Sequence, residues 1–115
     1  MPRTVILSSA RTPFGKMGGS LAPVDAADLG GVAIAGALER SGVAPEQVQQ
    51  VSFGQVIQAG QGQIPSRQAQ IAGGIPKEVP SETVNKVCAS GMRSAGLVDQ
   101  AIRAGDIEVG VAGGM

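Results

Sequence analysis

The sequence predicts an α/β fold in which strands and helices alternate in the order β-α-β-α-β-α-β. Two observations carry this prediction. Short apolar or alternating runs of strand length are separated by stretches with helical periodicity, and the 18 glycines and 7 prolines fall mainly at element ends and in loops. The hydrophobic content of 43% is almost entirely aliphatic, with only two phenylalanines. Small aliphatic side chains suit the close packing of helices on a sheet.

The first strand is expected over residues 4–8, which form an apolar, β-branched run. A long loop punctuated by proline and glycine follows over 9–20. Asp25 is a favourable N-cap for the first helix, and Gly42 is placed to end it. Apolar or small residues at helical spacing predict the buried face of this helix. They are Leu29, Val32, Ala33, Gly36 and Ala37.

The middle of the chain predicts one strand and one short helix. Residues 45–48 form a turn or a single helical turn, since a proline begins them. Residues 51–56 alternate apolar with small or polar side chains, as a strand does. After a glycine-rich loop over 60–63, a short helix is expected over 66–72, and the glycine pair at 73–74 ends it.

The last third of the chain predicts two strands with a long helix between them. Residues 81–85 form a short strand, and residues 89–104 form the strongest helix, which ends at Gly105. The first half of this helix is so apolar that it requires protein on several sides. Residues 109–112 form the last strand. We expect an exposed apolar patch on this chain by itself, and hence self-association.

Composition and charge exclude several classes of function. The formal net charge is zero and the isoelectric point is about 6.2, with no basic stripe, so a nucleic-acid partner is not expected. No apolar run approaches the roughly 20 residues that span a bilayer, so no membrane association is expected. One cysteine cannot form an internal disulfide, which favours a reducing, cytoplasmic location.

Cys88, the only cysteine, lies where the strand over 81–85 leads into the helix over 89–104. The first turn of a helix presents unpaired N–H groups and the positive end of the helix dipole, which favour a nucleophilic thiolate. A lone cysteine is also often a small buried hydrophobic residue. The chain has no histidine to serve as its base. The residues by themselves therefore leave both interpretations open, a nucleophile or an inert core thiol.

Metal and dinucleotide sites are poorly supported by the sequence. A metal site is not expected, because the chain has no histidine and no second cysteine. The loop around Gly60 and Gly62 follows a strand and precedes a helix, but it lacks the third glycine that a dinucleotide-binding turn requires.

Residues 85–92, which read Asn-Lys-Val-Cys-Ala-Ser-Gly-Met, resemble the active-site cysteine segment of thiolases, in the acetyl-CoA acetyltransferase branch. Further segments are similar to the same family in the same order along the chain. They are residues 9–15, residues 54–56 with 65–69, and residues 112–115. The resemblance covers essentially the whole chain, and it implies a thiolase-like layered α/β sheet.

The resemblance implies that Cys88 is the catalytic nucleophile, which takes an acyl group from acyl-CoA. Its own backbone N–H would be one donor of the oxyanion hole. Coenzyme A thioesters would be the substrates, no other cofactor is expected, and no residue of this chain is assigned to coenzyme A binding. The complete protein would condense two acetyl-CoA molecules reversibly to acetoacetyl-CoA and CoA, and it would be a homo-oligomer.

Two further catalytic segments of the family, Gly-His-Pro and Cys-x-Gly-Gly-Gly, do not occur in these 115 residues. In the family, that histidine activates the nucleophile, and that cysteine moves a proton at the α-carbon of the second acetyl-CoA. We therefore expect residues 1–115 to be the N-terminal portion of a thiolase N-terminal domain. This half-domain would be incomplete, with its last strand and the C-terminal domain absent, and it would have no turnover by itself.

Two other functions stay open at this point. A degradative 3-ketoacyl-CoA thiolase, with a broader range of acyl chain lengths, would carry most of the same motifs. A non-catalytic thiolase-like module would keep the fold, with Cys88 buried and inert.

Overall fold

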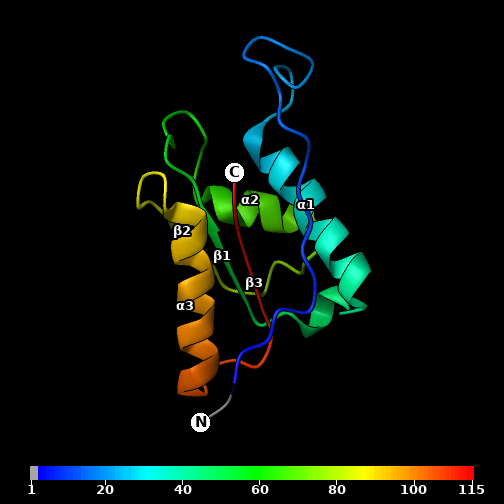
Figure 1. Cartoon of the computed structure of the whole chain (residues 1–115), viewed down its shortest axis with the longest axis vertical. Coiled ribbons are helices and arrows are strands. Elements are labelled where there is room, and N and C mark those ends of the chain that lie inside the picture. The colour runs from blue at the N-terminus through cyan, green and yellow to red at the C-terminus, as the bar shows by residue number, and fades with distance from the viewer. Residues whose placement is uncertain (1–2) are drawn as a thin grey trace.

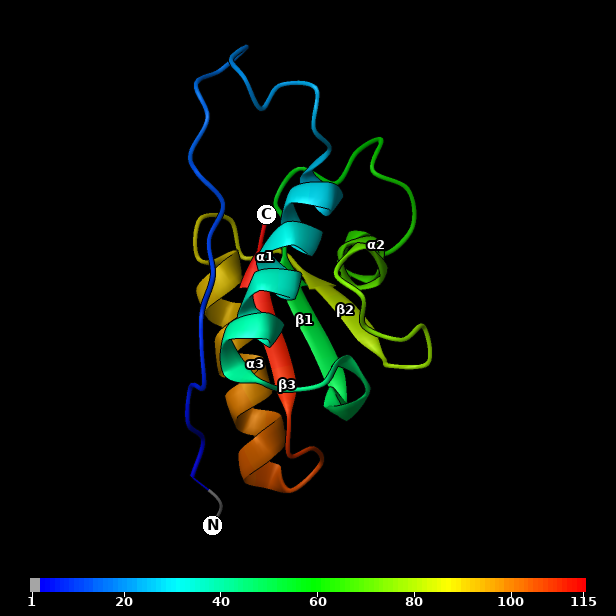
Figure 2. The ribbon, with the colours of Figure 1, turned by 90° about the vertical axis from the view of Figure 1, so that its right-hand side faces the viewer.

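In the computed structural model, which describes residues 3–115, a parallel sheet is covered by helices on both faces (Figure 1). Its three strands, in the spatial order β2-β1-β3, are β1 (Gln50–Gly54), β2 (Ser81–Val84) and β3 (Gly110–Gly114). The helices are α1 (Ala26–Ser41), the 3-10 helix η1 (Pro45–Gln47), α2 (Pro65–Ala72) and α3 (Ser90–Ala104). Helices α1 and α2 pack on one face and α3 on the other. In Figure 2, α1 and α2 lie in front of the sheet and α3 lies behind it.

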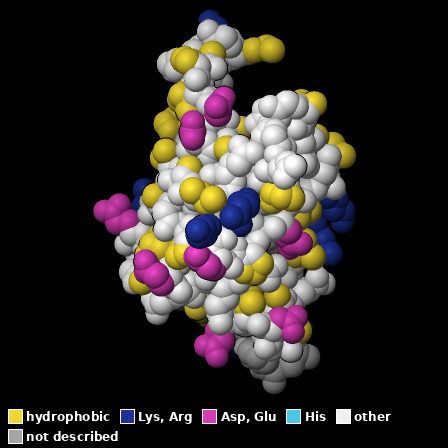
Figure 3. Space-filling view, turned by 180° about the vertical axis from the view of Figure 1, so that it is seen from behind, with side chains coloured by type: hydrophobic (Ala, Val, Ile, Leu, Met, Phe, Trp, Pro, Cys, Tyr) yellow, Lys and Arg dark blue, Asp and Glu magenta, His cyan; other side chains and the backbone are white. Residues whose placement is uncertain are grey.

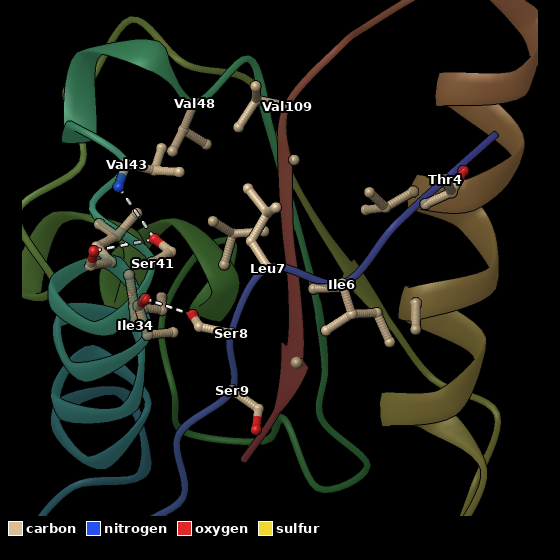
Figure 4. Close-up of a pocket in the computed structure, with 18 of the residues that line it drawn as sticks. Thr4, Ile6, Leu7, Ser8, Ser9, Ile34, Ser41, Val43, Val48 and Val109 are labelled. Carbon is tan, nitrogen blue, oxygen red and sulfur yellow. Dashed lines mark hydrogen bonds between the residues drawn. The ribbon is translucent and has the colours of Figure 1, made fainter. Parts of the chain in front are cut away.

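The predicted α/β fold is confirmed, but the strand expected over residues 4–8 is wrong. This segment runs extended beside α1 and β3, and Ile6 and Leu7 point to opposite sides of it, as in a strand (Figure 4). A cavity of about 460 Å³ lies between the segment and β3. Because a strand requires a hydrogen-bonded neighbour, this separation leaves the segment extended but unpaired. Its serine at position 8 bonds instead to the Ala37 carbonyl of α1, at 2.6 Å.

The other predicted strands and helices occur in the expected order. Strand β1 is central, and four of its five residues are buried, as expected for a strand covered on both faces. Val51 of β1 lies in register with Ser81 of β2 and with Val111 of β3. The hydrophobic core forms between this strand and the helices α1 and α2. Its members are Ile34, Leu38, Val48, Val51, Phe53, Ala69, Ile75 and Val79.

The buried face of α1 differs from the predicted one. Val32, which the apolar spacing places on that face, is 64% exposed. The buried residues are Ala27, Gly30, Gly31, Ile34 and Leu38. A Cβ on Gly31 would lie 2.6 Å from the Cβ of Ala72 in α2, closer than two carbons can approach. Glycine therefore lets α1 approach α2 closely, and this contact between helices determines which face is buried.

A polar cluster connects α2 with β2. The hydroxyls of Ser81 and Thr83 on β2 both donate to the buried Ser66 hydroxyl on α2, each at 2.9 Å. The Ser66 N–H donates in turn to the Thr83 hydroxyl at 3.1 Å, which satisfies one of the free donors of the helix N-terminus. The cluster holds β2 against α2, and thereby holds the strand that leads to Cys88.

Helix α3 ends where the sequence predicts. Gly105 follows it with φ of 86°, a left-handed conformation that glycine adopts at helix C-termini without strain. Ser90, Ser94 and Val98 are its buried residues, and the helix packs against β1 and β3. Met92 is exposed, so part of the apolar surface of α3 is uncovered, as its composition predicted.

Further apolar side chains are exposed in the N-terminal part of the chain. Ile6 is 88% exposed, and Phe14 and Met17 lie exposed in the loop over 9–20, which projects from the body of the molecule (Figure 3). Charged side chains of both signs are dispersed over the face seen in Figure 3. Within residues 3–115, no helix combines the length and hydropathy needed to cross a membrane.

We predict that the isolated chain self-associates through the N-terminal segment and the outer edge of β3. Substitution Ile6→Lys should weaken this association, because a charge on an exposed edge opposes further strand pairing. The matched control is Val32→Lys, which adds the same charge at an exposed apolar site on α1. Sedimentation velocity over a range of concentrations measures both. A chain that is monomeric at every concentration, or equal association in the two variants, would contradict this prediction.

Candidate active site

Cys88 lies in the turn between β2 and α3, at the carboxyl end of the parallel sheet. This is where α/β folds place ligands and reactive groups, because loops and helix N-termini converge there. Its position between strand and helix is the one predicted from the sequence. The side chain is exposed, so in this structure Cys88 is not the buried core thiol that the inert interpretation requires.

An asparagine shapes the first half of this turn. The Asn85 side-chain oxygen accepts a hydrogen bond from the Val87 N–H at 3.0 Å, which forms an Asx turn. Its amide nitrogen donates to the Val56 carbonyl at 3.2 Å, which connects the turn to the loop that follows β1. Val87 has φ of 48°, a conformation that is strained for a β-branched residue. The surrounding contacts must therefore hold Val87 in place.

Ser90 closes the second half of the turn. Its hydroxyl accepts a hydrogen bond from the Lys86 N–H at 2.8 Å and donates one to the Val87 carbonyl at 2.6 Å. The Ser90 N–H also donates to the Val87 carbonyl, at 3.1 Å. The side chain is only 4% exposed. Ser90 thus connects both residues that precede Cys88 to the first turn of α3.

The backbone N–H of Cys88 has no acceptor with hydrogen-bond geometry in the part of the chain described, residues 3–115. An exposed thiol is therefore accompanied by a free N–H on the same residue. Such a pair offers a nucleophile and a hydrogen-bond donor for the negative charge that develops on an attacked carbonyl oxygen.

Glycines bring the backbone of α3 into direct contact with the ends of the strands. A Cβ on Gly54, the last residue of β1, would lie 2.6 Å from the Ser90 carbonyl carbon and 2.7 Å from the Gly91 nitrogen. A Cβ on Gly114, at the end of β3, would lie 3.3 Å from the Gly91 Cα. The ends of the strands therefore fix how closely the first turn of α3 approaches the sheet, and this distance in turn sets the position of Cys88. No comparable contact explains Gly96, further along α3.

Sequence reasoning located Cys88 but missed the roles of Asn85 and Ser90. An asparagine two residues before a turn residue is a recognisable signal for an Asx turn. For Ser90, the sequence carries no comparable signal, because its partners are backbone groups that only the folded turn brings within reach. No group of three or more His, Cys, Asp or Glu side chains within residues 3–115 is arranged to hold a metal ion.

The fold and the site together define a parallel α/β protein with an accessible cysteine at the carboxyl end of its sheet. The family description "Thiolase, N-terminal domain" matches residues 4–115, and the chain belongs to the thiolase family.

Curated relatives carry acetyltransferase names. The chain is 56% identical over 114 residues to the acetyl-CoA acetyltransferase of Cupriavidus necator, a match that covers 99% of this chain and 29% of that protein. It is 53% identical over 114 residues to a probable acetyl-CoA acetyltransferase of Mycobacterium leprae, with the same shares covered. The mitochondrial acetyl-CoA acetyltransferase of Danio rerio is 49% identical over 111 residues, 96% of this chain and 26% of that protein. The chain thus spans less than a third of the length of these relatives.

Substitution Gly54→Ala should destabilise the fold by about 1–3 kcal/mol, because the added methyl group would overlap the backbone of Ser90 and Gly91. The control is Gly96→Ala in the middle of α3, where a Cβ meets only the tip of Arg93 at 4.0 Å. That change should stabilise the protein by up to about 1 kcal/mol, since alanine favours helix. Chemical denaturation followed by circular dichroism measures both. Equal stability of the two variants would be inconsistent with the close contact described.

Proposed function

We propose that the complete protein is an acyltransferase of the acetyl-CoA acetyltransferase type, with Cys88 as the acyl acceptor. The observation that carries this proposal is the exposed Cys88 thiol with a free N–H on the same residue, at the carboxyl end of a parallel sheet. The names of the relatives support acetyl-CoA as the acyl donor. The overall reaction proposed is the reversible condensation of two acetyl-CoA molecules to acetoacetyl-CoA and CoA.

In the first step, the Cys88 sulfur attacks the carbonyl carbon of the thioester and forms a new carbon–sulfur bond. The carbonyl oxygen becomes an oxyanion, which accepts a hydrogen bond from the Cys88 N–H. Collapse of this intermediate breaks the bond between the acyl carbon and the coenzyme A sulfur. The leaving thiolate gains a proton to replace the one that the Cys88 thiol has lost, so acetyl-cysteine and free CoA result. Loss of one oxyanion donor typically lowers the rate by about 10²–10³-fold.

The remaining catalytic groups are proposed to lie outside residues 1–115, because these residues contain no histidine and no second cysteine. Both a base for Cys88 and a proton acceptor for the second acetyl-CoA are needed to complete the reaction. The outer edge of β3 and the cavity beside it also fit the proposal that the complete protein has further residues in this domain. Most of the side chains that line this cavity are apolar and the N-terminal segment across it is unpaired, an arrangement suited to a further strand of the same domain.

A degradative thiolase acting on longer 3-ketoacyl-CoA chains remains the second candidate, since the Cys88 turn would serve either substrate. The non-catalytic module is less well supported, because its cysteine should be inaccessible whereas Cys88 is exposed. The assembly of the complete protein as a homo-oligomer also remains a prediction. So does a cytoplasmic location, because several relatives are mitochondrial by name.

Iodoacetamide should label Cys88 of the complete natural polypeptide rapidly at neutral pH, and prior incubation with acetyl-CoA should suppress the labelling. The reason is that an acetylated sulfur cannot be alkylated. Mass spectrometry of the peptide that contains Cys88 measures both effects, and Cys88→Ser provides the unlabelled control. Slow labelling that acetyl-CoA leaves unchanged would favour the non-catalytic module.

The 115-residue chain by itself should have no turnover in a thiolysis assay, in which CoA cleaves acetoacetyl-CoA. These residues contain no histidine to act as a base for the thiol, and the second proton transfer has no acceptor. The control is the Cys88→Ser chain, purified in the same way. Turnover above that control would show that residues 1–115 contain a sufficient active site.

A further inference from the structure

Hydrogen bonds to the Val87 carbonyl hold the peptide between Val87 and Cys88 in place. The Val87 oxygen accepts two hydrogen bonds from Ser90, one from the hydroxyl at 2.6 Å and one from the N–H at 3.1 Å. The hydroxyl has little choice of direction, because the Lys86 N–H already donates to the same oxygen at 2.8 Å. The Ser90 hydroxyl therefore accepts one hydrogen bond from the turn and donates one to it.

This peptide is trans and planar, so its C=O and N–H groups point in opposite directions. When Ser90 holds the Val87 carbonyl toward α3, the Cys88 N–H must point away from α3. This explains why the Cys88 N–H has no acceptor in residues 3–115 although it lies within a tight, hydrogen-bonded turn. Hydrogen bonds on a carbonyl also polarise its peptide, which makes the attached N–H a better donor.

We propose that Ser90 is a positioning residue for acyl transfer, which acts through the Val87–Cys88 peptide. Its hydroxyl fixes the plane of that peptide, and thereby directs and strengthens the Cys88 N–H as the donor to the thioester oxyanion. The inference rests on the proposed function of Cys88 as the acyl acceptor. Ser90 itself touches neither the thiol proton nor the substrate in this mechanism.

Two reactions of the same thiol separate this role from a general effect on the turn. Acetylation by acetyl-CoA passes through an oxyanion and needs the Cys88 N–H. Alkylation by iodoacetamide displaces iodide from carbon in one step and forms no oxyanion. It needs an accessible thiolate, which acetylation needs as well. The ratio of the two rates at Cys88 therefore reports on the oxyanion donor alone. Both rates are followed on the complete natural polypeptide, by mass spectrometry of the peptide that contains Cys88.

Substitution Ser90→Ala removes the hydroxyl and should lower the acetylation rate by about tenfold or more, approaching the 10²–10³-fold typical of a lost oxyanion donor. The alkylation rate should change little. The matched control is Ser94→Ala, one turn further along α3. Ser94 is fully buried, and its hydroxyl donates to the Ser90 carbonyl at 3.0 Å, whereas the bonds to Lys86 and Val87 run through the Ser90 hydroxyl and N–H. Both rates should stay at the wild-type level in this control.

A fall of equal size in both rates would overturn the proposal, since Ser90 would then affect the thiol or the fold in general. Unchanged acetylation in Ser90→Ala would overturn it as well. Failure of the proposed function is visible separately, as a wild-type Cys88 that acetyl-CoA does not acetylate at all, and the inference about Ser90 would fall with it.

Amide hydrogen exchange in the wild-type protein tests the geometry without any variant. The Lys86 N–H, bonded to the Ser90 hydroxyl, should exchange slowly, whereas the Cys88 N–H should exchange quickly. Slow exchange at Cys88 would overturn the proposal even if Ser90→Ala failed to fold.

Discussion

The position of Cys88 depends on the contact between the backbone of α3 and the ends of the strands β1 and β3. Gly54 and Gly114 end these two strands, and Gly91 lies in the first turn of the helix above them. Because Gly54 and Gly114 have no side chains, helix and sheet approach more closely than ordinary side chains permit.

The turn above this contact combines strain with a dense set of hydrogen bonds. Val87 holds a left-handed conformation that a β-branched side chain disfavours, and Asn85 and Ser90 hold it there from either side. The result is an exposed thiol and an N–H without an acceptor among residues 3–115, while almost every neighbouring backbone group is occupied. This selective lack of partners is what a preorganised site for a developing negative charge requires.

At the outer edge of β3, by contrast, the neighbouring segment has no strand partner. Residues 4–8 have the composition of a buried strand, and they lie extended beside the sheet, but a cavity separates them from β3. The apolar side chains of this segment are consequently exposed, although their pattern is that of a core strand. The segment illustrates that a strand needs a neighbour at hydrogen-bonding distance, whatever its own composition.

Local patterns predicted most of the fold. Periodicity and residues that favour turns and caps predict the α/β class and the order of the three α-helices and three strands from α1 to β3. They also predict the left-handed glycines at 42 and 105 and the location of Cys88. The family was also recognisable from short segments around Cys88. These features depend on residues that lie within a few positions of one another along the chain, so the sequence alone is sufficient to predict them.

By itself, the sequence determined the order and approximate positions of the helices and of the three paired strands, and the place of Cys88 between β2 and α3. Only the tertiary structure decided that α1 buries the face containing Gly31, that residues 4–8 stay unpaired, and that the Ser90 hydroxyl bonds to the Val87 carbonyl. Each of these depends on groups distant in sequence, or on backbone atoms whose directions follow from the folded turn. Packing sets the distances between such groups and the directions of such backbone atoms, and no pattern of residue types along the chain contains this information.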